Sequence, residues 1–150
     1  MGLIDLLPLG GDQRVPLGVE PPADVVVLED DPQVAALAVE LCREMGLQAA
    51  PFSAPAPFLA EYELQPPRVV VLDWLLEREI GSAAFMAVRH RFGDVPIVCW
   101  TGMEPALLPD MVADDARTQV VDKAAGVAPF QDAIRWALDE LGAADRTPRP

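Results

Sequence analysis

The sequence predicts a doubly wound α/β domain, in which a parallel sheet carries helices on both faces. Five apolar segments alternate with five segments of helical periodicity, which is the pattern of repeated βαβ units. Four of the five apolar segments are continuous runs rather than alternating ones, as expected of strands buried on both faces. The length of 150 residues suits one such domain with a single core.

The first βα unit begins with the strand DVVVLEDD at 24–31. Asp31 and Pro32 are typical of a helix start, because an acidic cap precedes a proline in the first turn. Apolar residues at helical spacing follow, and we expect the helix to end at Gly46.

The second and third strands differ in strength. QAAPFSA at 48–54 is a weak strand, and its Pro51 is tolerated only at a sheet edge, because proline cannot donate a hydrogen bond to a neighbouring strand. A short helix is predicted at 57–64, and the apolar run RVVVLDW at 68–74 predicts a central strand.

The second half of the chain repeats the pattern. A helix at 82–93 precedes the strand PIVCWTG at 96–102. The segment 104–115 has helical tendency but contains Pro109, so we expect a short, kinked or split helix.

A last strand at 119–123 and a helix at 128–142 complete the domain. The predicted domain spans 24–142, with an N-terminal extension at 1–23 and a C-terminal tail at 143–150. No internal repeat and no second domain is apparent.

The charge and cysteine content limit the function. A net charge of −13 argues against nucleic-acid binding and against an anionic membrane surface, since both rely on Lys and Arg. Cys42 and Cys99 lie in apolar segments, which indicates buried, reduced thiols in a cytoplasmic protein. The apolar start MGLIDLLPL lacks the basic region and the cleavage site of a signal peptide.

Polar residues follow the predicted strands at the ends where an open parallel sheet binds ligands. These residues are Glu29, Asp30 and Asp31, then Asp73, Thr101 and Lys123. Neighbouring carboxylates repel one another unless a hard cation lies between them, and Mg²⁺ prefers such oxygen ligands. For Asp31, helix capping is the simpler interpretation.

This set of side chains suits phosphoryl transfer. Asp73 would attack phosphorus as a nucleophile, and a metal ion would neutralise the phosphoryl oxygens. Lys123 would pair with one of these oxygens, Thr101 would donate a hydrogen bond, and Gly102 would leave room for the group.

In these residues the chain resembles the receiver domain of two-component response regulators. That family carries an acidic pair, a phosphoacceptor aspartate, a Ser/Thr and a lysine after strands 1, 3, 4 and 5. The corresponding residues here are Glu29 and Asp30, Asp73, Thr101 and Lys123, and Gly81 also matches a glycine common in the family.

The resemblance implies a flavodoxin-like sheet of five strands in the order 2-1-3-4-5, surrounded by five helices. The strand with Pro51 would then lie at an edge. The resemblance also implies that Mg²⁺ is held by Asp30, Asp73 and the backbone carbonyl of Leu75, with Glu29 acting directly or through water.

Three residues depart from the family pattern. Ala124 replaces the proline that usually follows the lysine, and Glu77 replaces a proline beyond the phosphoacceptor. Val120 stands where the family has a rotating aromatic residue, so we expect an unusual signalling surface.

Other residues have simpler interpretations. His90 lies opposite the apolar side of its helix between Arg89 and Arg91, so we expect a solvated face without a role in phosphotransfer. Trp136 lies away from the apolar stripe of the last helix, and either packs on a neighbouring helix or faces a partner. Trp74 and Trp100, beside the expected site, are interpreted as packing residues.

The sequence therefore predicts a stand-alone receiver rather than an enzyme. It would take a phosphoryl group from a sensor histidine kinase or phosphotransfer protein onto Asp73 in a phosphorelay. Output would pass to a downstream protein target, and the chain could also pair with a second copy as a homodimer.

Two alternatives remain open. One is an interaction module of the same fold whose phosphorylation is vestigial. The other is an aspartate-nucleophile phosphohydrolase of the haloacid dehalogenase type, which Leu75 disfavours because that class needs a second acid at this position.

Overall fold

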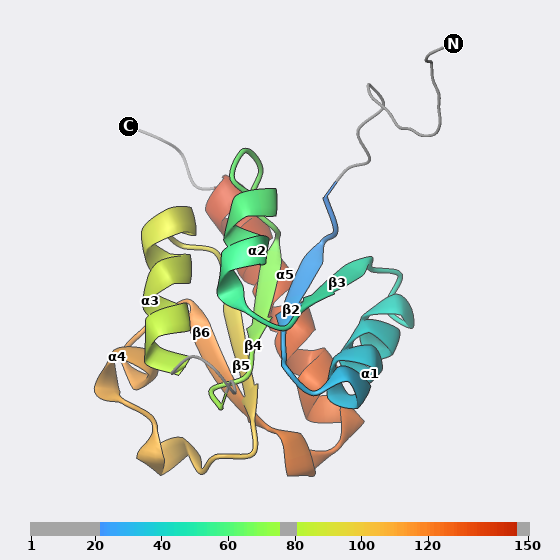
Figure 1. Ribbon diagram of the computed structural model, residues 1–150, viewed down its shortest axis with the longest axis vertical. Coiled ribbons are helices and arrows are strands. Elements are labelled where there is room, and N and C mark those ends of the chain that lie inside the picture. The colour runs from blue at the N-terminus through green and yellow to red at the C-terminus, as the bar shows by residue number, and fades with distance from the viewer. Residues whose placement is uncertain (1–21, 76–80, 147–150) are drawn as a thin grey trace.

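The structure is a computed structural model that describes residues 22–75 and 81–146 (Figure 1). Its centre is a five-stranded sheet in the order β3-β2-β4-β5-β6, with every neighbouring pair parallel. The strands are β2 (Val25–Leu28), β3 (Ala49–Phe52), β4 (Val69–Leu72), β5 (Ile97–Thr101) and β6 (Thr118–Asp122). In chain order this is 2-1-3-4-5, which confirms the predicted fold class.

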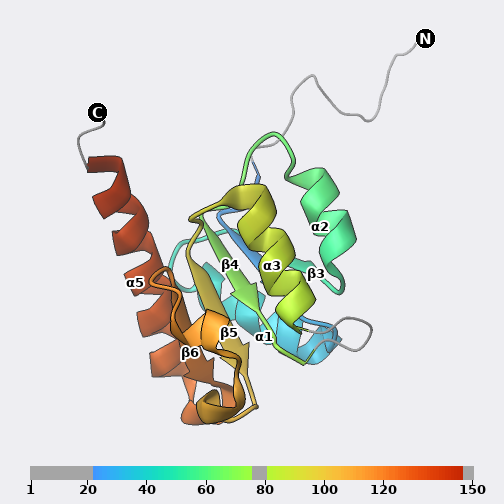
Figure 2. The same cartoon turned by 90° about the vertical axis from the view of Figure 1, so that its left-hand side faces the viewer.

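Helices cover both faces of the sheet, and Figure 2 shows α3 and α5 on opposite sides of it. The α-helices are α1 (Pro32–Arg43), α2 (Pro55–Glu61), α3 (Gly81–Phe92), α4 (Asp110–Ala113) and α5 (Val127–Arg146). Two short 3-10 helices are η1 (Pro105–Leu107) and η2 (Lys123–Ala125). Within the described ranges, no helix has the length and apolar character needed to cross a membrane.

Successive residues of the central strands point into two different cores. In β2, Val26 and Leu28 contribute to the core beneath α2, α3 and α4, whereas Val25 and Val27 contribute to the core beneath α1 and α5. All four residues are fully buried, which explains the absence of polar alternation in this segment.

The edge strand and the first helix follow the predicted local chemistry. Pro51 lies in β3 at the sheet edge, in register with Val27. Asp31 caps α1 by accepting hydrogen bonds from the backbone N–H groups of Gln33 and Val34. The chain then leaves the helix through Gly46, whose φ of 79° lies in the left-handed region.

Three helix boundaries differ from the sequence prediction or refine it. Pro109 separates η1 from α4, as its place within 104–115 predicts. Helix α2 begins earlier than expected, at Pro55, because proline is well suited to a first helical turn. Helix α5 continues to Arg146, beyond Gly142, since the strong helix formers Ala143 and Ala144 follow the glycine.

Arg89 corrects the expectation of a uniformly solvated face on α3. His90 and Arg91 are exposed, but only 19% of the Arg89 side chain is accessible. Its Nε and Nη2 donate to Asp115 at 2.7 and 3.0 Å, and other hydrogen bonds reach the carbonyls of Gly93, Val95 and Arg117. The guanidinium therefore joins α3 to the start of β5 and to the segment before β6.

Both cysteines are buried free thiols, as expected. Burial raises the pKa of Cys42 to about 11 and the pKa of Cys99 to about 12, so neither is ionised near neutral pH.

Candidate functional site

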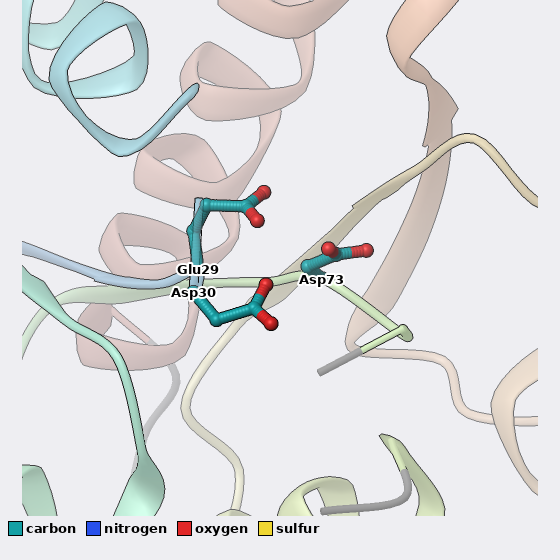
Figure 3. A group of neighbouring side chains, drawn as sticks. All are labelled: Glu29, Asp30 and Asp73. Carbon is teal, nitrogen blue, oxygen red and sulfur yellow. The ribbon is translucent and has the colours of Figure 1, made fainter. Parts of the chain in front are cut away.

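Three carboxylates lie together beyond the ends of β2 and β4. Because Leu28 and Leu72 are in register, the residues that follow them emerge side by side, and the Asp73 N–H donates to the Leu28 carbonyl at 3.0 Å. Figure 3 shows the carboxyl groups of Glu29, Asp30 and Asp73 close to one another. One carboxylate oxygen from each residue lies within 4.8 Å of the others.

Lys123, directly after β6, bridges two of these carboxylates. Its Nζ is 2.7 Å from Glu29 Oε1 and 3.2 Å from Asp73 Oδ2. The side chains of Glu29 and Asp73 are only 3% and 6% exposed, whereas that of Lys123 is 25% exposed. The ammonium therefore enters from the solvent side and compensates negative charge that is buried.

The remaining carboxylate oxygens are held by backbone N–H groups. Glu29 Oε2 accepts from the Asp31 N–H at 3.2 Å, and Asp73 Oδ1 accepts from the Leu75 N–H at 3.1 Å. These bonds fix both carboxyl groups before any ligand arrives. Asp31 itself caps α1, which supports the simpler interpretation of that residue.

Burial and pairing act in opposite directions on the charges at the site. Burial raises the pKa of Glu29 and outweighs the hydrogen bonds from Lys123 and from the Asp31 backbone. Burial alone would lower the pKa of Lys123, but the hydrogen bond to Glu29 and the charge of Asp73 raise it overall. Lys123 is therefore firmly protonated near neutral pH.

Thr101 and Gly102 complete the edge of the site at the end of β5. Leu72 is in register with Cys99, so Thr101 lies one residue beyond the level of Asp73 on the neighbouring strand. Thr101 is fully buried, and its Oγ1 accepts from the Met103 N–H at 3.2 Å. A Cβ added to Gly102 would meet no atom within 4 Å, so there is open space beside Thr101.

The loop after Lys123 has a local hydrogen bond that proline could not form. The Asp122 carboxylate accepts from the Ala124 N–H at 2.8 Å, and η2 begins at this point. Val120 on β6 is half-buried against the core beneath α2, α3 and α4. Glu77, the third departure from the receiver pattern, lies outside the described residues.

The three tryptophans differ in their surroundings. Trp74 and Trp100 are buried, as the packing interpretation expects. Trp136 on α5 is half-buried and packs against the core beneath α1 and α5.

The sequence did not predict that Trp100 lies beside Lys123. The centre of its ring is 5.6 Å from Lys123 Nζ. Only the position of Trp100 next to Thr101 hinted at this proximity. The contact depends on the side-chain direction at a strand end, which apolar periodicity does not report.

Gly81, at the start of α3, permits a close approach to Trp74. A Cβ on Gly81 would lie 2.5 Å from both the Trp74 ring and the Trp74 carbonyl oxygen. Glycine is therefore required here for packing.

Comparison with solved structures gives the same architecture. NtrX from Brucella abortus, determined in complex with ADP, matches with a TM-score of 0.72 and 19% identity, over 82% of this chain. This chain spans only 28% of the length of that protein. The NtrX receiver domain by itself matches over 77% of this chain and 98% of its own, with a TM-score of 0.66 and 19% identity.

A CheY-like response regulator receiver domain protein from Methanospirillum hungatei matches with a TM-score of 0.70 and 15% identity, over 80% of this chain and 96% of its own. No family model and no curated protein matches the sequence. The chain thus has the fold of response-regulator receiver domains.

Proposed function

We propose that this protein is a phosphorylation-dependent switch of two-component signalling. Asp73 accepts a phosphoryl group from a sensor histidine kinase or a phosphotransfer protein, and the modified protein acts through contact with a downstream protein. The observation that carries the proposal is the lysine ammonium placed on both Glu29 and Asp73 beside a third carboxylate, at the ligand-binding edge of the sheet.

The donor set fits a hard divalent cation such as Mg²⁺. Three carboxylates supply oxygen ligands at one place, and the backbone of Leu75 lies beside Asp73. Asp30, Asp73 and the Leu75 carbonyl would hold the ion, with Glu29 acting directly or through water. When bound, the ion supplies positive charge to the phosphoryl oxygens.

The side chains have distinct roles in the transfer. A carboxylate oxygen of Asp73 forms a bond to phosphorus while the phosphorus–nitrogen bond of the donor phosphohistidine breaks. The imidazole keeps the electron pair and takes up a proton, and Asp73 becomes an acyl phosphate. Lys123 then turns from the carboxylates to a phosphoryl oxygen, and the Thr101 hydroxyl donates to another.

Modification by a small phosphodonor tests the proposal without the cognate kinase. Incubation with Mg²⁺ and acetyl phosphate should add one phosphoryl group to the wild-type protein, as measured by intact mass. Asp73→Asn should remain unmodified, and Asp30→Asn should react more slowly because a proposed metal ligand is lost. Equal modification of wild type and Asp73→Asn would show that another residue is the acceptor.

The departures from the receiver pattern favour one alternative, a receiver-fold module whose partner contacts do not depend on phosphorylation. Two departures support it. Val120, at the position of the usual aromatic residue, is aliphatic and packs against the core beneath α2, α3 and α4, and the Ala124 N–H donates to the Asp122 carboxylate, which proline could not do. Trp136 is the aromatic candidate for the partner surface in either case. Mg²⁺ titration separates the two functions, since a module of this kind need not bind the ion.

A further inference from the structure

The indole ring of Trp100 lies against the ammonium group of Lys123. Nζ is 5.6 Å from the ring centroid, within the range of a cation–π interaction. Trp100 is 4% exposed, and its ring packs on Phe130 of α5 with a centroid separation of 4.7 Å. It is therefore a fixed surface, whereas the lysine side chain that it contacts is flexible.

Core packing alone does not account for a tryptophan at this position. Its Nε1 is buried and has no hydrogen-bond partner in the described part of the chain. An unpartnered buried N–H group is unfavourable, and phenylalanine would fill much of the same space without it. The property that distinguishes tryptophan here is its electron-rich face, which attracts cations most strongly among the aromatic side chains.

The ring also differs from the carboxylate partners of Lys123. Glu29 and Asp73 bind the ammonium at 2.7 and 3.2 Å, but both are also placed to interact with a cation or a phosphoryl group. When their oxygens are engaged in this way, Lys123 loses its closest partners. Trp100 does not ionise and has no oxygen ligand to offer a hard cation, so its attraction for the ammonium persists.

We propose that Trp100 is a positioning residue for Lys123. Its ring holds Nζ at the edge of the site while Glu29 and Asp73 are occupied, so that the ammonium does not extend into solvent. The ring contact is independent of phosphotransfer, but its consequence for reaction rate rests on the proposed function. In the wild-type protein, Lys123 should therefore remain at the site when Glu29 and Asp73 interact with a cation or a phosphoryl group.

The chain offers a direct observation of this contact, because Lys123 is its only lysine. Selective ¹³C labelling of lysine gives one set of side-chain resonances, and the ring current of Trp100 shifts its Hε protons upfield. We expect this shift in wild type, in Mg²⁺-saturated wild type and in the variant Glu29→Gln/Asp73→Asn, which removes both carboxylate charges. Trp100→Leu should abolish it.

If the Lys123 Hε protons of the Glu29→Gln/Asp73→Asn variant have the chemical shifts of a solvent-exposed lysine, the proposal is overturned. The backbone amide spectrum establishes that this variant is folded. If the double variant is unfolded, the Glu29→Gln single variant is used instead. Loss of the upfield Hε shift in that variant would also contradict the proposal. None of these measurements requires phosphorylation.

Rates of modification by acetyl phosphate with Mg²⁺ test the consequence. Trp100→Leu should react about threefold to thirtyfold more slowly than wild type, and Trp100→Phe should recover part of the rate. Val98→Ala is the matched control, because Val98 is buried on the same strand and in the same core but lies farther from the strand end. It should react at the wild-type rate.

A wild-type rate in Trp100→Leu would contradict the positioning role. If wild type itself is not modified, the proposed function fails, whereas the lysine resonances still decide whether the ring holds the ammonium.

Discussion

Replacing Lys123 with methionine removes the positive charge that bridges two buried carboxylates. Glu29 and Asp73 are 3% and 6% exposed, so water cannot take over from the ammonium without rearrangement. Removing one partner of a buried ion pair costs about 3–5 kcal/mol. Because Lys123 is 25% exposed, we expect the lower end, about 3 kcal/mol, in the absence of divalent cations.

The loss in Lys123→Met should depend on pH. Burial raises the pKa of Glu29, and removal of the ammonium raises it further. A carboxyl group whose pKa rises on folding stabilises the folded state below its unfolded pKa, and this contribution is lost as pH rises through the folded pKa. The stability deficit of the variant should therefore be largest near pH 7.5 and smaller near pH 5.

Urea denaturation in EDTA, followed by circular dichroism, measures this deficit. Lys123→Arg retains the charge and should lose less stability than Lys123→Met. Mg²⁺ at about 100 times its Kd should add about 2.7 kcal/mol to a variant that binds it. A loss below about 1 kcal/mol for Lys123→Met near pH 7.5, or a loss that does not change with pH, would refute the reasoning.

Three further predictions test other parts of the structure. Arg89→Met removes the guanidinium that pairs with a carboxylate at 2.7 Å, and should lower the free energy of unfolding by about 3 kcal/mol in urea titrations. Unchanged stability would show that the network is dispensable. Gly81→Ala places a Cβ 2.5 Å from Trp74 and should cost about 1–3 kcal/mol, whereas Gly102→Ala meets no atom within 4 Å and should be nearly neutral. Equal thermal stabilities of the two glycine variants would contradict this. Ala124→Pro introduces the residue usual in receivers but removes an N–H donor, so it should lower stability by about 1 kcal/mol; a higher midpoint of unfolding would be the opposite result.

The fold could be predicted because its main signals are local. Continuous apolar runs at 25–28 and 69–72 mark strands buried on both faces, and the structure buries every residue of both. Pro51 limited its strand to an edge for a covalent reason, namely its missing N–H. The parallel topology then placed the residues after each strand at one edge of the sheet, so the proximity of Glu29, Asp30 and Asp73 could be expected.

Contacts that depend on side-chain direction could not be predicted in the same way. Arg89 has the same sequence neighbourhood as the exposed Arg91, and only the tertiary position of Asp115 makes it different. Similarly, Trp100 has an apolar environment whether or not an ammonium lies over its ring. The pairing of Lys123 with Glu29 was also missed, because sequence reasoning assigned the lysine to a phosphoryl group and the glutamate to a metal.

The most direct test of the central claim is the identity of the modified residue. Wild-type protein treated with acetyl phosphate and Mg²⁺ is reduced with borohydride, which converts an aspartyl phosphate to homoserine, and its peptides are mapped by mass spectrometry. The proposed function predicts homoserine at position 73, dependent on Mg²⁺ and absent from untreated protein. An unaltered Asp73 in protein that carries phosphate elsewhere, or in protein that carries none, would contradict it.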